Sequence, residues 1–186
     1  YNDDYGVEYA NVRNPEEYFY LIVKGDSMEP RIKDGDLALV HKQPTLNDGD
    51  LGVIVYGDNE GTLKKFSRRG NTIILSPFNP DYEPKIISGE DLNNVYIAGK
   101  VVETKTKSGN WIFTPADKET TTGFIFYPGG KVEHEAYKPL MRALSAKGVL
   151  CVLIEMPFRL AIFDVNAADG IADDYPEITD WYIGGH

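Results

Sequence analysis

Short runs of β-branched and aromatic residues fill the first part of the chain, and glycine, aspartate, asparagine and proline separate them. Runs of this length and spacing predict an all-β domain. We expect its strands at residues 18–23, 36–41, 51–56, 62–67, 72–76, 85–87 and 95–103. Residues 77–84 lack periodicity and hold three prolines, which predicts an ordered loop or an extended edge segment.

The pattern changes after residue 103. Residues 104–110 are short, polar and glycine-containing, which marks a boundary between two periodic segments. We therefore expect one domain at residues 1–106 and a second at residues 107–186.

In residues 107–186, continuous apolar runs alternate with segments in which apolar residues recur at the spacing of a helix. An apolar run at residues 123–127 is followed by apolar positions at helical spacing between residues 136 and 144, and then by a fully apolar run at residues 149–154. The last run is typical of a strand buried on both faces. With a helix expected over residues 166–174 and a strand at 181–183, the order is β-α-β-α-β, which indicates a parallel sheet. The predicted fold is a mainly β domain followed by an α/β segment with a partial parallel sheet.

Composition narrows the function classes. The 186 residues include 19 basic and 29 acidic side chains, for a net charge of −10, which argues against a dominant basic surface for nucleic acid. No apolar run approaches the roughly 20 residues that span a bilayer, so no membrane attachment is expected. The single cysteine, Cys151, excludes an internal disulfide and favours a reducing compartment, so we expect the cytoplasm.

Two stretches carry candidate chemistry. Residues 25–30 read GDSMEP and follow a predicted strand, so Ser27 is either an exposed nucleophile or the N-cap of a short helix. Residues 60–66 read EGTLKKF, and alternation along a strand sends Lys64 and Lys65 to opposite faces. One lysine then points inward, unless the pair lies on an edge strand where lysine discourages aggregation.

Together these stretches resemble the LexA-type serine peptidases, which are self-cleaving repressors and their mutagenesis-protein relatives. The resemblance covers residues 18 to about 103 and rests on GDSMEP, on the two later DGD triplets, on TLKKF and on the RGN that follows it. It implies that Ser27 is the nucleophile, that Lys64 is the general base and that Lys65 faces outward. Asp26 and Met28 then lie in the vicinity of the oxyanion and the substrate. No cofactor and no metal are implied.

The proposed base requires a particular environment. Lysine has an unperturbed pKa of about 10.4, and desolvation lowers it by up to roughly 3–5 pKa units. An apolar wall is therefore part of the mechanism, and we expect Leu63, Phe66 and Met28 to supply it. The oxyanion needs backbone N–H donors near Ser27.

The same resemblance implies partners. Members of the family usually form homodimers and bind DNA through an N-terminal helix-turn-helix domain. They cut an Ala-Gly or Cys-Gly bond of their own chain, and in the SOS response a RecA-type co-protease promotes this cleavage. No Ala-Gly or Cys-Gly pair precedes Ser27 here. We therefore expect the cleavage site and the helix-turn-helix domain outside this sequence.

Residues 111–186 resemble the first part of an α/β-hydrolase. The PGG at residues 128–130 stands where that fold places an oxyanion loop, and Gly185-His186 matches the start of the G-x-S-x-G elbow, whose serine is the next residue. Without the resemblance, the PGG is better explained by an ordinary strand-to-helix turn. Three functions stay open: a self-cleaving Ser/Lys peptidase of a LexA-type or phage-type repressor, an esterase-like α/β-hydrolase fragment lacking its nucleophile, and a non-catalytic dimerisation module.

Overall fold

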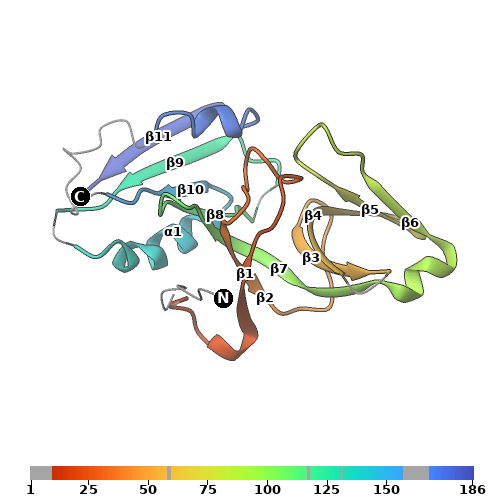
Figure 1. The fold of residues 1–186 in the computed structure, drawn as a ribbon. Coiled ribbons are helices and arrows are strands. Elements are labelled where there is room, and N and C mark those ends of the chain that lie inside the picture. The colour runs from red at the N-terminus through yellow and green to blue at the C-terminus, as the bar shows by residue number, and fades with distance from the viewer. Residues whose placement is uncertain (1–9, 58–59, 117, 131, 157–167) are drawn as a thin grey trace.

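The structure is a computed structural model that describes residues 10–57, 60–116, 118–130, 132–156 and 168–186. Within these residues eleven strands join in one sheet (Figure 1). They are β1 (Tyr18–Ile22), β2 (Leu37–His41), β3 (Leu51–Tyr56), β4 (Glu60–Arg69), β5 (Thr72–Ser76), β6 (Lys85–Ser88), β7 (Tyr96–Lys105), β8 (Trp111–Phe113), β9 (Thr122–Tyr127), β10 (Leu150–Leu153) and β11 (Asp180–Gly185). The helices are α1 (Lys138–Ser145) and the short 3-10 turns η1 (Pro15–Glu17), η2 (Gly89–Asn94), η3 (His134–Tyr137) and η6 (Ala172–Asp174).

Strands β1 to β7 form the antiparallel part of the sheet. Strand β7 is central, because it pairs with β2, β3 and β8. Alternating burial along β5 shows that one face of the sheet covers a core. All seven strands expected from the sequence are present, and β3 and β5 have the expected bounds. This region is the mainly β domain that the pattern predicted.

Strands β9, β10 and β11 form the parallel part. Strand β9 lies between β10 and β11 and is parallel to both. All four residues of β10 are buried, as expected for a strand covered on both faces, and α1 packs against β10. The predicted parallel sheet is confirmed. No helix in the described part of the chain is both long and apolar enough to cross a membrane.

The prediction of a helix over residues 166–174 is wrong for residues 168–171, which the structure describes. Residues 166 and 167 lie outside the described part, residues 168–171 form a turn, and only η6 is helical. Gly170 explains the difference, because its φ of +80° is left-handed and ends any right-handed helix. The apolar spacing is met instead by Ala168 and Ile171, which pack on the sheet.

A hairpin joins the two parts of the sheet. Strand β7 turns through residues 106–110 into β8, with Glu103 opposite Phe113 and Lys105 opposite Trp111. The expected domain boundary lies in this hairpin. Buried clusters around Met28 and Phe66 lie on one side of the hairpin, and those around Trp111 and Val152 lie on the other. Because one sheet runs through both sides, the division into domains at residues 1–106 and 107–186 stays a prediction.

Candidate active site

Ser27 lies in an irregular turn between β1 and β2 that is anchored at both sides. Gly25 has a φ of +82°, a left-handed conformation that favours glycine, and its N–H donates to Asp34 Oδ1 at 2.8 Å. Met28 is only 2% exposed and packs in the core with Leu63. Because residues 27–31 form turns and no helix, the alternative in which Ser27 caps a helix is wrong.

The first DGD triplet, residues 34–36, closes this turn. Val23 N–H donates to Asp36 O and Gly35 N–H donates to Val23 O, both at 2.8 Å. The Asp36 carboxylate is buried and accepts a hydrogen bond from Lys33 N–H at 2.8 Å. Burial raises the pKa of Asp36. The triplet therefore fixes the segment that presents Ser27.

Lys64 reaches Ser27 from β4. Its Nζ lies 2.8 Å from Ser27 Oγ and 3.0 Å from both Thr62 Oγ1 and Leu63 O. Each of these partners is an uncharged oxygen, and among the described residues no carboxylate forms an ion pair with Lys64. Burial lowers the pKa of the Lys64 ammonium. A partly buried amine with no counterion next to a hydroxyl has the geometry of a nucleophile and its base.

The second DGD triplet, residues 48–50, holds β4 beside Lys64. Gly49 N–H donates to Phe66 O, and Phe66 N–H donates to Asp50 O, both at 2.8 Å. Asp48 Oδ1 accepts a hydrogen bond from Arg68 N–H at 2.7 Å. These bonds are made by Phe66 and Arg68, the second and fourth residues after Lys64, so they fix the strand that brings the Lys64 side chain to Ser27.

Asp50 is the most buried charge of this motif. Its side chain is 0% exposed and pairs with Lys100 at 2.9 Å and Lys118 at 2.7 Å. Burial pushes the pKa of Asp50 upward, but the hydrogen bonds from Lys118, Lys100 and Asn47 outweigh it, so the pKa is lowered. Lys118 follows β8, so the region beyond the hairpin contributes to the support of β4.

The loop at residues 77–84 covers the turn of Ser27. Asn79 N–H donates to Ser27 O and Asn79 Nδ2 donates to Asp26 O, both at 3.1 Å. Tyr82 Oη donates to Asp26 Oδ1. Sequence reasoning predicted an ordered loop but missed these contacts, because its only signal was the density of prolines.

The structure thus brings Ser27 and Lys64 together and places the other expected site residues around them. Asp26 is exposed and faces the 77–84 loop, whereas Met28 points into the core. In the described part of the chain the N–H groups of Ser27 and Met28 donate no hydrogen bond. Lys65 is exposed, as expected from strand alternation. Of the expected apolar wall, Leu63 packs with Met28, whereas Phe66 packs in a neighbouring cluster.

The motifs of the second region also meet. Tyr137 Oη lies 3.2 Å from Gly129 N, which donates to it, and 3.0 Å from His186 Nδ1. The glycine-rich loop after β9 and the Gly-Gly-His at the end of β11 are therefore neighbours at the carboxyl ends of parallel strands.

Comparison with known proteins agrees with both parts. Residues 1–102 match the sequence model described as Peptidase S24-like, and residues 123–186 match that of the alpha/beta hydrolase family. A LexA repressor from Citrifermentans bemidjiense is 51% identical over 86 residues, which cover 45% of this chain and 41% of that protein. The chain thus spans about two fifths of the length of this curated relative. Because the first match covers more than half of the chain, the protein belongs to the Peptidase S24-like family.

Proposed function

We propose that this chain carries a serine peptidase in which Ser27 is the nucleophile and Lys64 its general base. The observation that carries the proposal is the 2.8 Å contact between Lys64 Nζ and Ser27 Oγ. Burial without a carboxylate partner favours the neutral amine, and only the neutral amine accepts the hydroxyl proton. Family membership supports the same reaction class.

The proposed reaction follows from the groups around the dyad. Neutral Lys64 removes the Ser27 proton while Oγ attacks the peptide carbonyl, and the resulting ammonium returns the proton to the leaving amine. Thr62 Oγ1 and Leu63 O hold Nζ in place. The N–H groups of Ser27 and Met28 stabilise the developing oxyanion, so Asp26 and Met28 act through the backbone that flanks Ser27.

We further propose that this peptidase is the dimerising, self-cleaving regulatory domain of a LexA-type repressor. The support is the similarity to a protein named LexA repressor. In this proposal the Ala-Gly or Cys-Gly substrate bond and the helix-turn-helix domain that binds DNA lie outside the sequence, and a RecA-type filament promotes cleavage. Sedimentation of the chain tests the dimer directly, and a monomer at micromolar concentration would count against it.

Labelling of Ser27 by a fluorophosphonate probe tests the dyad. The parent chain should be labelled at Ser27, with a rate that rises with pH, and Ser27→Ala should abolish labelling. Likewise, the parent chain should cleave a supplied Ala-Gly peptide, and Ser27→Ala should not. A parent chain that is labelled at another serine or at none would overturn the proposal.

One observation favours a second candidate, an esterase-like α/β-hydrolase of which residues 111–186 are a fragment lacking the nucleophile. The contacts of Tyr137 with Gly129 and His186 bring together two motifs of the α/β-hydrolase resemblance. A longer form of the chain with Ser-x-Gly directly after His186, and turnover of p-nitrophenyl acetate by the Ser27→Ala variant of that longer form, would support this candidate. Loss of all turnover in that variant would assign the activity to the peptidase site.

A further inference from the structure

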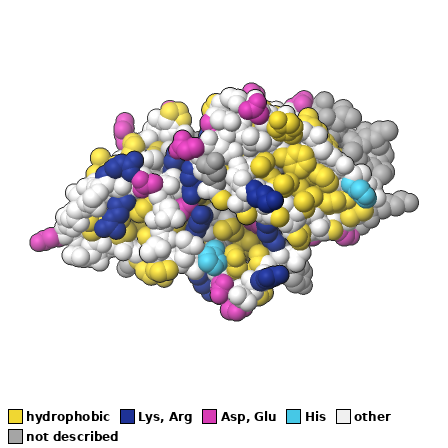
Figure 2. All heavy atoms as spheres, turned by 180° about the vertical axis from the view of Figure 1, so that it is seen from behind, with side chains coloured by type: hydrophobic (Ala, Val, Ile, Leu, Met, Phe, Trp, Pro, Cys, Tyr) yellow, Lys and Arg dark blue, Asp and Glu magenta, His cyan; other side chains and the backbone are white. Residues whose placement is uncertain are grey.

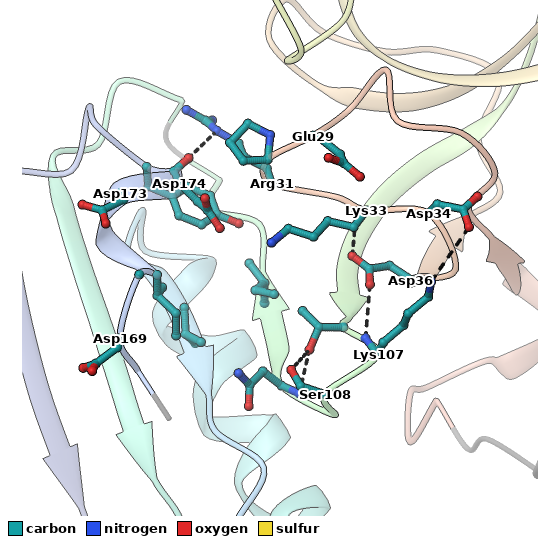
Figure 3. Close-up of a pocket in the computed structure, with 18 residues that line it drawn as sticks. Glu29, Arg31, Lys33, Asp34, Asp36, Lys107, Ser108, Asp169, Asp173 and Asp174 are labelled. Atoms are coloured by element: carbon teal, nitrogen blue, oxygen red, sulfur yellow. Dashed lines mark hydrogen bonds and ion pairs between the residues drawn. The ribbon is translucent and has the colours of Figure 1, made fainter. Parts of the chain in front are cut away.

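Arg31 links the turn of Ser27 to the C-terminal region. It lies four residues after Ser27, and its Nε donates to Asp174 O at 3.1 Å. Its terminal nitrogen forms an ion pair with Glu177 at 2.6 Å. Figure 3 shows Arg31 reaching Asp174 across the edge of a cavity of about 790 Å³. This contact joins residues about 140 positions apart in the chain.

Two aromatic rings enclose the Arg31 guanidinium. Its central carbon lies 4.4 Å from the centroid of Phe78 and 5.0 Å from that of Tyr175. A planar cation stacked on aromatic faces is held by electrostatic attraction as well as by packing. Tyr175 is buried, so its ring is a fixed support. Arg31 therefore fastens the 77–84 loop to the C-terminal region.

Phe78 transmits this contact toward the nucleophile. The next residue, Asn79, donates its two hydrogen bonds to the carbonyl oxygens of Asp26 and Ser27. Because a peptide unit is planar, fixing a carbonyl also fixes the N–H at its other side. Asn79 thus orients the N–H groups of Ser27 and Met28, which are the oxyanion donors of the proposed reaction.

We propose that Arg31 is a positioning residue for Ser27, and that docking of residues 174–177 sets the rate of the peptidase site through Phe78 and Asn79. The inference rests on the proposed function of Ser27. It assigns the α/β region a regulatory part in the peptidase, since displacing residues 174–177 releases the 77–84 loop. The coupling runs through contacts observed in the structure, and its energetic weight is what the experiment measures.

The experiment measures fluorophosphonate labelling of Ser27 across pH in Arg31→Ala, Arg31→Lys and Glu177→Gln. We expect Arg31→Ala to lower the labelling rate about tenfold at every pH, without moving the pH of half-maximal labelling, because the contacts of Lys64 are unchanged. Arg31→Lys keeps the cation but loses the planar stack, so it should recover part of the rate. Glu177→Gln, which alters only the distal ion pair, should lower the rate about twofold. Arg13→Ala is the control and should keep the parent rate, because Arg13 is an exposed arginine with no ring contact to Phe78 or Tyr175.

The outcomes separate this inference from the proposed function. If folded Arg31→Ala is labelled at the parent rate, the inference is overturned and the dyad is unaffected. If the parent itself is not labelled, the dyad proposal fails, and amide hydrogen exchange then decides the inference. Exchange of residues 77–84 should rise in Arg31→Ala and in Glu177→Gln, and unchanged exchange in both variants would overturn it.

Discussion

The antiparallel and parallel regions of this sheet each bring a glycine-rich turn beside polar side chains, but they leave those side chains in different chemical states. In the antiparallel region Lys64 is partly buried, has only uncharged partners and touches Ser27. In the parallel region Tyr137 bonds both Gly129 and His186, so the polar groups satisfy one another. We therefore expect reactivity at Ser27, where a base is desolvated without a counterion, because proximity of polar groups alone does not activate a hydroxyl.

The two regions also differ in how their turns are held. Each DGD triplet of the antiparallel region bonds to the backbone of a neighbouring segment, one beside Ser27 and one beside Lys64. Seen from behind, the parallel region instead presents a broad hydrophobic surface (Figure 2), and its exposed large apolar residues include Leu140, Tyr182 and Ile183. The antiparallel region also exposes large apolar side chains, namely Tyr82, Ile86 and Tyr96, so the difference between the two regions lies in the polar contacts that fix the turns around Ser27 and Lys64.

Removing the proposed base, Lys64, should have the largest effect on the difference between the two regions. Lys64→Met should lower Ser27 labelling by about 10²–10⁴-fold, the usual contribution of a positioned general base. Mass spectrometry of the labelled serine measures the rate. Lys65→Met is the matched control, since Lys65 is the adjacent lysine on the opposite, exposed face, and it should be labelled at the parent rate. Equal rates for both variants would remove Lys64 from the mechanism.

The two segments that carry the proposed dyad could be located from the sequence because they obey local rules. Strand alternation places Lys64 and Lys65 on opposite faces, but the choice of Lys64 over Lys65, and of Ser27 as a nucleophile over a helix cap, rested on the family resemblance. The partners of Asp50 were beyond reach, because Lys100 and Lys118 come from distant segments and no local pattern names them. The contacts of Asn79 were missed for the same reason.

The parallel region shows a related limit. Its parallel strands followed from the alternation of apolar runs and helical spacing, but the prediction of a helix over residues 166–174 was wrong in the described residues. Apolar spacing there is set by packing of Ala168 and Ile171 on the sheet, and Gly170 has a left-handed backbone. The spacing of apolar residues indicates which residues are buried. Whether those residues form a helix depends also on the backbone conformation of one residue, here Gly170.

Substitution of Asp50 tests how much the turns of the antiparallel region contribute to the free energy of unfolding. Asp50→Asn leaves Lys100 and Lys118 without their buried carboxylate, and breaking a buried ion pair costs about 3 kcal/mol of the free energy of unfolding. Urea denaturation measures this loss. Asp48→Asn removes the exposed carboxylate of the same triplet and should cause a much smaller loss. A small loss for both variants would mean that Asp50 does not hold β4.

A pair of glycines compares backbone strain in the two regions. Gly25 and Gly170 have φ of +82° and +80°, and a Cβ added at either meets nothing within 4 Å. Alanine at each position should therefore cost about 1 kcal/mol of stability through the backbone alone. Only Gly25→Ala should also slow Ser27 labelling, because only Gly25 lies in the nucleophile turn. Equal labelling of the two variants would show that this turn tolerates displacement.

The smallest effect expected is on the pH dependence of stability. Burial lowers the pKa of Lys64 in the folded state, so between the folded and the unfolded pKa the unfolded chain binds more protons, and stability rises with pH across that window. Below the folded pKa the buried ammonium opposes folding. Lys64→Met removes this contribution, so the free energy of unfolding should rise at neutral pH and its slope between neutral and alkaline pH should flatten, whereas Lys65→Met should keep the parent slope. Urea denaturation at a series of pH values measures both slopes, and a Lys64→Met slope equal to that of the parent would show that the amine beside Ser27 is well solvated, which would make the two regions of the sheet chemically alike.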